Sequence, residues 1–491
     1  MKTIFTLSFF SIFGMHCLFA QYTTPGNGNS YSLTDLVEIS NGVVIDTNDA
    51  YLLNSDLTIA ANDTLYITED GVWNINPDVL ITVFGAFITQ PPQEFTIRSS
   101  AEGTHFQGIR FEDGSHAHIF QTKILYGGGV RVLSDDFYMS HSEVSHQIAG
   151  VSTGGAISFS YGQPYVGYSK LSMNDMPAFS SGANSSVGAR FYNNVLEYNT
   201  MLNQNRPQIN MGASGVNDTI FIVNNTIIGL RDNTMAGGIS ASSLLGIENT
   251  VHIEGNIIRD NRYGITVAGA ASKGVIFDNI IEDNDTQNNP AQGGSGISLN
   301  ATGEPSMDII VHGNQIRRNL WGITVINQAR INLGDGTAES PGENIFAENG
   351  NGGDIYALYN NTAHDIEAQN NCWIEGQDST AEQVEEVIVH QLDIDNLGLV
   401  NFTPFLCSTL STEDTNLMQK VQISPNPAKE FFVISNAAQS KYEIYDMSGK
   451  VLQNGSIDSE SYHVAISLQP GKYIVVVSGS EGRRSLGLLV R

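Results

Sequence analysis

Polar and apolar residues recur with one fixed spacing within residues 249–349. Each copy has Asn, then Ile two residues later, a second Asn five residues later and Gly-Ile from the eighth, as in the copies that begin at Asn256 and Asn314. Less complete copies begin at Asn279 and Asn344. The spacing between copies is irregular but lies in the range of solenoid repeats. Each copy predicts a short strand, a turn and a second short strand, which can bury its apolar side only by stacking on its neighbours.

Upstream of these copies, apolar and polar residues alternate in short groups separated by Asn, Asp or Gly. The groups begin at Leu57 and predict short strands joined by tight turns. The alternation continues through 107–124 and 137–144 without the Asn signature. Residues 160–185 lose this rhythm, so we expect a long excursion from the solenoid there, and long ordered loops are often functional. The polar residues 21–55 predict a cap over the first coil.

The repeat resembles that of right-handed parallel β-helix proteins of the pectate-lyase-like class. The resemblance covers roughly residues 56–408. It implies an all-β solenoid in which inward Ile side chains stack from coil to coil, at about 4.8 Å per coil. It also implies that Asn stacks on Asn at the bends, where Asn tolerates the left-handed conformation and bonds its side chain to the backbone.

The end of the solenoid is also marked in the sequence. Residues 370–373 and 398–406 resemble the closing coil of such helices, and a short amphipathic helix is expected over Ala381–His390 between them. An oxidising exterior favours a disulfide between Cys372 and Cys407. In a β-helix this bond would tie the final excursion to the last coil.

Both ends of the chain carry signals for export. Met1–Ala20 has one cation, Lys2, followed by an apolar run, and predicts a secretory signal peptide cleaved after Ala20. We therefore expect no transmembrane segment in the mature chain. The Cys17 thiol would be removed with this peptide.

The C-terminal residues differ in character from the solenoid. Residues 409–420 predict a linker, and the alternating apolar strands of 421–491 predict a small antiparallel β-sandwich. Three motifs in order resemble the C-terminal sorting domain of type IX secretion cargo; their residues are Pro425, Asn426, Pro427, Asp446, Gly449, Lys450, Gly471 and Tyr473. The resemblance implies that the type IX machinery exports the protein to the outer-membrane surface or the exterior, with removal of the domain. An ordinary carbohydrate-binding sandwich is the alternative.

The charge balance restricts the partners. With 51 acidic and 23 basic residues, the formal net charge is −28. Such a chain repels nucleic acid and anionic membrane surfaces. An extracellular glycan or another protein is the expected partner.

Charged residues line up when the copies are superposed. One outward column holds Arg259, Glu282 and Arg317, and the next holds Asp283 and Arg318. The simplest interpretation is a ladder of alternating charge on a solvated face. The alternative is a polysaccharide lyase, because β-helix lyases use a cation to neutralise a uronate and a Lys or Arg base to remove a proton.

Two aromatic residues occupy matching positions in the complete copies. Tyr263 and Trp321 flank the inserted loop 285–294 in sequence, and with Glu282 and Arg259 they are the candidate glycan-binding residues. The alternative is that both rings lie flat over neighbouring coils.

Metal chemistry is weakly indicated. His116, His118, His141 and His146 lie on neighbouring strands, but such His residues usually act singly. Residues 283–285 and 335–336 offer oxygen ligands suited to Ca²⁺ without an EF-hand pattern. We therefore predict no metal site and no cofactor, with Ca²⁺ as the one ion left open. The paired carboxylates of polygalacturonases are not found either.

Three hypotheses remain, because β-helices host many functions. The leading one is a secreted β-helix protein that binds a glycan or protein without catalysis. The polysaccharide lyase alternative predicts that Arg317, Arg318, Asp283 and Tyr263 converge in an open cleft. A purely structural adhesin predicts no cleft at all.

Overall fold

The computed structural model describes residues 21–303, 307–407, 421–429, 431–445, 450–459, 461–479 and 482–490. These residues form two compact units, which divide after Cys407. The predicted signal peptide and the predicted linker 409–420 lie outside the described residues and stay predictions.

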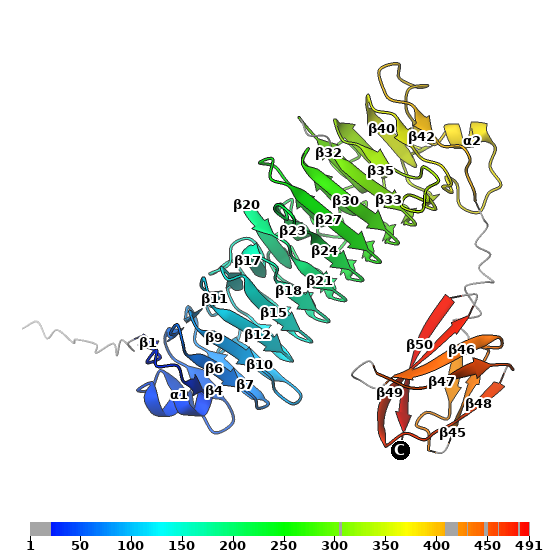
Figure 1. Cartoon of the computed structure of the whole chain (residues 1–491). Helices are drawn as coiled ribbons and strands as arrows, with labels where there is room; N and C mark the ends of the chain where they lie inside the picture. Colours follow the sequence, from blue (N-terminus) through cyan, green and yellow to red (C-terminus); the bar gives the residue numbers. More distant parts are fainter. Residues whose placement is uncertain are drawn as a thin grey trace, which may run out of the picture. The chain divides into compact units, whose positions relative to one another are not determined.

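The first unit is a β-helix built from three long sheets (Figure 1). Each coil contributes one strand to sheet A, one to sheet B and one to sheet C, and each strand pairs in parallel with the strand of the next coil. The exception is the antiparallel pair at the start of sheet C.

The bounds of the strands follow the order of coils. Sheet A consists of β1 (Tyr22–Thr23), β5 (Leu57–Ile59), β8 (Leu80–Val83), β11 (Gly108–Phe111), β14 (Val130–Val132), β17 (Ile157–Gly162), β20 (Phe179–Val187), β23 (Pro207–Met211), β26 (Gly237–Ser242), β29 (Ile265–Ala268), β32 (Ser295–Ala301), β35 (Trp321–Asn327), β40 (Leu358–Thr362) and β42 (Ile388–Val389). Sheet B consists of β2 (Ser30–Tyr31), β6 (Thr64–Ile67), β9 (Ala86–Thr89), β12 (His116–Phe120), β15 (Asp136–Ser140), β18 (Tyr165–Gly167), β21 (Arg190–Tyr192), β24 (Ile220–Val223), β27 (Asn249–Glu254), β30 (Ser272–Phe277), β33 (Asp308–His312) and β36 (Ile331–Asn332). Sheet C consists of β3 (Val44–Asp46), β4 (Tyr51–Leu53), β7 (Gly71–Ile75), β10 (Phe95–Ser99), β13 (Thr122–Leu125), β16 (Glu143–Ser145), β19 (Lys170–Ser172), β22 (Val195–Glu197), β25 (Thr226–Ile228), β28 (Ile257–Arg259), β31 (Ile280–Glu282), β34 (Gln315–Arg317) and β37 (Ile345–Ala347). Two short pairs, β38 (Gly350–Asn351) with β39 (Asp354–Ile355) and β41 (Ile366–Glu367) with β43 (Val400–Asn401), complete the unit.

The apolar columns fill the interior as the repeat predicts. Ile258, Ile281 and Ile316 pair in register along sheet C and are 0% exposed. The repeat glycines permit close stacking, since a Cβ at Gly264 would lie 2.4 Å from the carbonyl oxygen of Gly296 in the next coil. Burial of these columns, rather than any single coil, stabilises the solenoid.

Asparagine ladders run through the bends. The backbone N–H and Nδ2 of Asn256 both donate to Oδ1 of Asn279 at 2.9 Å, and Asn279 repeats this arrangement with Asn314. The stacking of Asn on Asn is thus present. The left-handed residue, however, is the one before each ladder Asn, such as Asp278 with φ 56°. The prediction was displaced by one residue because the ladder Asn is buried and held in place by its amide, so the preceding residue turns the corner.

The same ladder continues upstream with hydroxyl groups. Ser142 accepts from the N–H of Thr122, and Ser169 accepts from the N–H of Ser142. A Ser Oγ accepts a hydrogen bond as an amide oxygen does, so the coil needs no Asn here. The predicted excursion over 160–185 is therefore wrong, since β17, β18, β19 and β20 belong to the three sheets.

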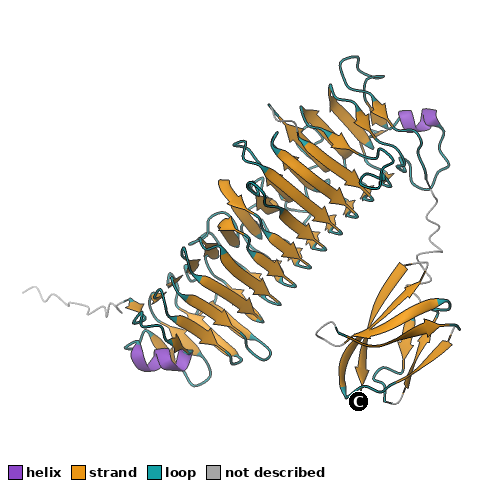
Figure 2. Ribbon diagram, viewed as in Figure 1, coloured by secondary structure: helices purple, strands orange, loops and turns teal. Residues whose placement is uncertain are grey.

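Helices lie at the two ends of the β-helix (Figure 2). The helix α1 (Leu33–Ile39) begins at the capping box of Ser32 and Asp35 and buries Leu33 and Leu36. Within the predicted cap, β1 and β2 already pair with β5 and β6, so solenoid strands begin before residue 56. The helix α2 (Ala381–Glu385) is shorter than predicted because β42 joins sheet A directly after it. A disulfide joins Cys372 and Cys407.

The second unit contains two antiparallel sheets with one apolar core. One sheet consists of β44 (Gln422–Ser424), β45 (Phe431–Ser435) and β48 (Ser461–Ala465), and the other of β47 (Val451–Ile457), β46 (Ser440–Tyr445), β49 (Gly471–Gly479) and β50 (Gly482–Val490). No helix within the described ranges is long and apolar enough to cross a bilayer.

The predicted sorting motifs have distinct places in this unit. Asn426, between Pro425 and Pro427, donates through Nδ2 to the carbonyl of Gly487 and accepts from the N–H of Leu489. The motif therefore attaches the first residues of the unit to β50. Gly471 opens β49, the Tyr473 hydroxyl donates to the carbonyl of Gln469, and Lys450 precedes β47. Asp446 and Gly449 lie outside the described residues.

Candidate functional site

The arginines proposed for lyase chemistry are both held by carboxylates. Arg317 makes two hydrogen bonds of 2.7 Å to Glu375, and Arg318 makes two of 2.8 Å to Asp283 and one of 2.9 Å to Glu282. Both arginines line a pocket of about 610 Å³ beside Trp373 and α2. Asp283 contributes through its ion pair, and neither it nor Tyr263 lines this pocket.

The electrostatics of this cluster oppose a catalytic role. Hydrogen bonds to Asp283, together with that to Glu282, raise the pKa of Arg318 despite its partial burial. A guanidinium that removes a proton needs a lowered pKa and an unoccupied position towards the substrate. Here the neighbours stabilise the charged form and accept from Nε and Nη2. The four residues named for the lyase hypothesis do not converge in one cleft.

The predicted charge column exists, but its ion pairs differ from the prediction. Arg259, Glu282 and Arg317 are neighbours in register along sheet C. Arg259 lies 4.0 Å from Asp260, and Glu282 pairs with Arg318, while Arg317 turns to Glu375. The column is therefore a partly exposed ion-pair network spread over several coils, of a kind in which each exposed pair contributes little to stability.

Tyr263 is not presented as a flat platform. A Cβ at Gly237 would lie 2.2 Å from Cζ of Tyr263, so the ring lies against the preceding coil. Burial raises the pKa of the Tyr263 phenol to about 12. The Tyr263 ring therefore packs on a neighbouring coil instead of facing a ligand.

Trp321 lies at a different place, in a pocket of about 360 Å³ on the outer side of sheet A. Its ring centroid lies 4.6 Å from that of Tyr356 and 5.4 Å from that of Tyr359, with tilts of 42° and 58°. The tilts prevent the three rings from covering one another face to face. The residues that line the pocket are Pro290, Ala291, Gln292, Gly293, Ser295, Ser298, Trp321, Thr324, Ile326, Tyr359 and Asn361.

The wall of the Trp321 pocket is the inserted loop 285–294, and two side chains fix it. Trp321 donates through Nε1 to the carbonyl of Pro290 at 3.0 Å. Arg262, which is 6% exposed, donates to Oε1 of Gln287 at 2.6 Å and to the carbonyl of Gln292 at 2.5 Å. The loop is thus positioned before any ligand arrives, which lowers the entropic cost of binding.

The chemistry of the Trp321 pocket is uncharged throughout. Ser295, Ser298 and Thr324 form a chain of hydroxyl contacts, with Oγ1 of Thr324 at 3.0 Å from Ser295 and 3.1 Å from Ser298. None of its lining residues carries a formal charge, although the chain has a net charge of −28. Aromatic rings with hydroxyl and amide groups suit a neutral polyhydroxylated ligand.

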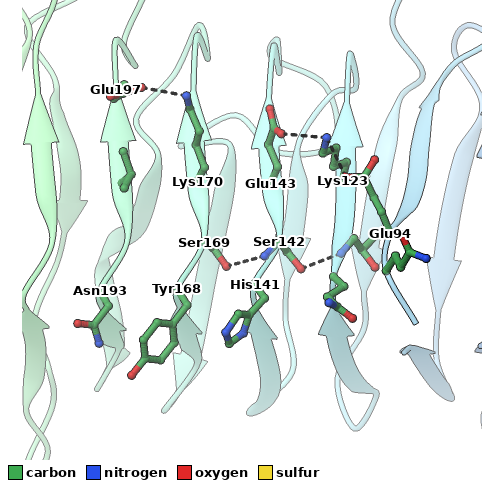
Figure 3. A pocket seen from close by; sticks show the side chains of 14 residues that line it. Glu94, Lys123, His141, Ser142, Glu143, Tyr168, Ser169, Lys170, Asn193 and Glu197 are labelled. Atoms are coloured by element: carbon green, nitrogen blue, oxygen red, sulfur yellow. Dashed lines mark hydrogen bonds and ion pairs between the residues drawn. The ribbon is translucent and has the colours of Figure 1, made fainter. Parts of the chain in front are cut away.

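A second surface was missed by the sequence analysis. A trough of about 680 Å³ crosses the outer side of sheet C from β10 to β22 (Figure 3). One rim carries alternating charges, with Lys123 at 2.9 Å from Glu94 and Lys170 at 3.0 Å from Glu197. The other rim carries His141, Tyr168 and Asn193. Its signal in the sequence was the loss of the Asn signature, which we interpreted as continued strands over 107–124 and 137–144 but as an excursion over 160–185.

A third aromatic feature runs along sheet B. Rings contact one another there from coil to coil, some stacked and some tilted or edge-on, in the order His118, Tyr138, Tyr165, Tyr192, Phe221, His252, Phe277 and His312. Tyr138 and Tyr165 are nearly parallel at 4.7 Å, so their facing surfaces cover each other. Burial is the main cause that raises the pKa of the Tyr165 phenol. This row stabilises the coils and presents mainly ring edges.

The predicted His residues do not form one cluster. His116 contacts Asp136 at 2.6 Å, His118 packs on Tyr138, and His146 stacks on Tyr126. Within the described part of the chain, one group has metal-ligand geometry, formed by Glu385, His390 and Asp393.

The ring nitrogens of His390 are both engaged. Nδ1 accepts from the N–H of Val400 at 2.9 Å, so Nε2 carries the proton that contacts Glu385 at 2.6 Å. This geometry is that of a hydrogen-bonded core His that joins α2 to the last coil.

The oxygens proposed for Ca²⁺ are also engaged. Asp283 binds Arg318, and Asp285 binds Arg231 at 2.6 Å. Asp335 accepts from Asn332 and Thr337, and the Thr337 hydrogen bonds are the main cause that lowers its pKa. The absence of a cofactor stays a prediction, with Ca²⁺ the one ion left open.

Comparison with known proteins gives two family matches. Residues 174–377 match a right-handed β-helix family described as "Protein of unknown function (DUF1565)". Residues 422–490 match the secretion system C-terminal sorting domain. Searches of curated proteins and of solved structures returned no significant match. The matches and the three parallel sheets together identify the chain as a right-handed parallel β-helix protein with a type IX secretion C-terminal sorting domain, which is secreted or held at the cell surface.

Proposed function

We propose that this secreted protein binds an extracellular glycan without chemically changing it, and that the Trp321 pocket binds neutral sugar rings. The uncharged lining of that pocket supports the proposal, because the rest of the chain is strongly acidic. A sugar ring would pack on Trp321 and Tyr359, and its hydroxyls would bond to Ser298, Thr324 and Asn361. The preformed loop 285–294 supports recognition of a rigid ligand.

Tryptophan fluorescence gives a direct test. The chain has three Trp residues, and Trp73 and Trp373 are 0% and 1% exposed. A ligand in the pocket therefore changes the emission of Trp321 above all. We expect the full chain to respond to at least one of cellohexaose, laminarihexaose, mannohexaose and xylohexaose, and hexagalacturonate to give no response.

Two variants make the fluorescence test specific. Trp321→Ala should remove the response and weaken binding about tenfold or more, since an aromatic contact adds about 0.5–1.5 kcal/mol beyond its buried area. Tyr263→Phe, which removes only a hydroxyl outside the pocket, should bind as the parent does. Equal affinity of Trp321→Ala and the parent for every bound hexasaccharide would refute the proposed site.

A polysaccharide lyase is the alternative function, and its assay is separate. Lyases release unsaturated products that absorb ultraviolet light. We expect no such product from polygalacturonate or from neutral polysaccharides, with or without Ca²⁺. Product formation that Arg317→Gln or Arg318→Gln abolishes would instead establish catalysis at the arginine pocket.

A further inference from the structure

The trough on sheet C contains residues in an unfavourable backbone conformation. Gln121, His141 and Tyr168 turn successive corners between sheets B and C with φ of 47°, 50° and 51°. The next five coils place smaller or more permissive residues at the same corner, namely Asn193, Asn224, Gly255, Asp278 and Gly313, and Glu343 follows them. Left-handed backbone is unfavourable for Gln and Tyr, whereas His adopts it more readily, and such strain is concentrated at functional sites. The backbone conformation of these corners therefore suggests a role for their side chains.

The corner side chains form a stack that ends at Tyr168. Phe120 and His141 lie 5.2 Å apart, and His141 and Tyr168 lie 5.1 Å apart with an interplanar angle of 15°. The next corner residue is Asn193, whose side chain is not aromatic (Figure 3). Tyr168 is 55% exposed. Within the described corner row, this stack ends with a ring whose second face is not covered by a following ring.

Polar groups of matching chemistry lie on both rims of the trough. The Asn193 amide is on the next corner, and the Lys170–Glu197 ion pair lies on the opposite rim. Lys170 and Glu197 keep 49% and 28% of their side chains exposed. An amide, an ammonium and a carboxylate together donate to and accept from vicinal hydroxyl groups.

The charges of the trough limit the ligand. Glu94, Glu143 and Glu197 face Lys123 and Lys170, so the formal charges of this rim favour the carboxylates. A polyanionic chain would be repelled, whereas hydroxyl groups gain charge-assisted hydrogen bonds. The trough crosses successive coils and therefore follows the direction of the solenoid axis, which suits an extended chain.

We propose that Tyr168, Asn193, Lys170 and Glu197 form a second carbohydrate-binding site, which takes a neutral glycan chain with a sugar ring packed on the exposed part of the Tyr168 ring. The site is separate from the Trp321 pocket in sheet and in residues. It extends the proposed glycan binding but does not depend on Trp321.

The test compares Tyr168→Asn with a matched control. Asn suits the left-handed corner better than Tyr, so this variant should fold with an undiminished Tm. Tyr126→Asn is the control, because Tyr126 is also left-handed (φ 56°), 40% exposed and stacked on a His, yet does not line the trough. Calorimetric titration of the full chain uses the same five hexasaccharides.

We expect two binding sites in the parent for at least one neutral hexasaccharide. Tyr168→Asn should weaken one of them about tenfold or more and leave the Trp321 fluorescence response intact. Tyr126→Asn should bind as the parent does.

Several outcomes would overturn this second site. Parental affinity and stoichiometry in Tyr168→Asn would do so, as would tighter binding of hexagalacturonate than of the neutral chains. A clear fall in Tm without a change in binding would show that the stack only stabilises the coil. If Trp321→Ala removes all binding, the trough is refuted and the Trp321 pocket stands. If Tyr168→Asn removes all binding, the Trp321 pocket is refuted instead. Failure of all hexasaccharides to bind refutes both sites.

Discussion

The early coils and the later coils of the solenoid share one backbone plan but build it from different side chains. From β13 to β19 the buried ladder uses Thr122, Ser142 and Ser169, and the corners use Gln, His and Tyr. From β25 to β37 the ladder uses Asn throughout, and most of the corners use Asn, Asp or Gly. The later coils follow the residue choice that the geometry favours, whereas the early coils depart from it where they form the trough. This contrast separates residues that maintain the coil from residues that are free to serve a ligand.

The largest expected effect on stability comes from the disulfide bond at the end of the later coils. The Cys372–Cys407 bond closes a segment with a sequence separation of 35. Replacing both residues by Ser should lower the free energy of unfolding by about 3–4 kcal/mol, because the unfolded chain regains loop entropy. Denaturant unfolding with and without reductant measures this. If the reduced parent and the double variant differ in midpoint, the loss is not that of the disulfide.

The second largest effect on the free energy of unfolding should come from replacing a residue of the hydrogen-bond ladder. The Asn279 side chain bonds to Asn256, Ile253, Phe277 and Asn314. Asn279→Ala should therefore cost about 3 kcal/mol, since buried donors and acceptors lose their partners. Thermal and denaturant unfolding give the value.

Ser142→Ala is the matched change in an early coil. Ser142 accepts from Thr122 and donates to Ser140, so its loss should cost about 1–2 kcal/mol. Equal losses in the two variants would mean that the hydroxyl and amide ladders are energetically equivalent, and the contrast would then lie in the corners alone.

Acid should weaken both ends of the solenoid. Burial opposes ionisation of Asp63, but hydrogen bonds from Thr24, Gly26, Gly28 and Asn29 outweigh it and lower its pKa. The hydrogen bonds from Arg317 lower the pKa of Glu375 in the last coils. A carboxyl with a lowered folded pKa stabilises the fold above its unfolded pKa, about 4, and this stability is lost as the pH falls through the folded value.

Variants at the two ends should therefore lose their effect in acid. Asp63→Asn should lower Tm at pH 7 by an amount that shrinks below about pH 4, and Glu375→Gln should behave likewise. Asp49→Asn, an exposed change near the same end as Asp63, serves as the control. A Tm difference for Asp63→Asn that stays constant from pH 7 to pH 3 would contradict the assignment.

Substitutions at the corners should change the free energy of unfolding least, and opposite substitutions in the two regions should have opposite signs. Gln121→Asn places a permissive residue at φ 47° and should stabilise the early coils by about 0.5–1 kcal/mol. Asn224→Gln, at φ 56° in a later coil, should destabilise by a similar amount. Unfolding midpoints of the two variants measure the pair. Two changes of the same sign would show that corner strain does not distinguish the regions.

Much of the fold could be predicted because the same sequence pattern recurs in successive coils of the solenoid. Asn256, Asn279 and Asn314 recur with Ile and Gly at fixed offsets, and each offset has one physical role. The early coils lack this pattern, because Ser142 and Ser169 stand where later coils have Asn. Their hydroxyl oxygens accept the hydrogen bond that an Asn side-chain oxygen accepts in the later coils. Tyr168 then looked like part of a loop, although it marks a corner.

The candidate site was less predictable for a different reason. Arg317 was correctly placed on the outer column, but its partner Glu375 lies 58 residues downstream in a segment outside the repeat. The repeat positions side chains along columns and contains no information about loops that fold back over them. Trp321 could be named as a candidate because it occupies a repeat position, whereas the neighbouring pocket wall at Pro290 comes from an insertion.

The ladder has a consequence for the length of the protein. Each ladder Asn presents one acceptor to the coil before it and donates to the coil after it, so a later coil can be joined to any other without an unmatched hydrogen bond. The solenoid can therefore lengthen or shorten in whole coils of about 4.8 Å. In such a rod the number of coils sets the length of the outer face, and the identity of each coil sets which side chains that face presents at a given distance from its end.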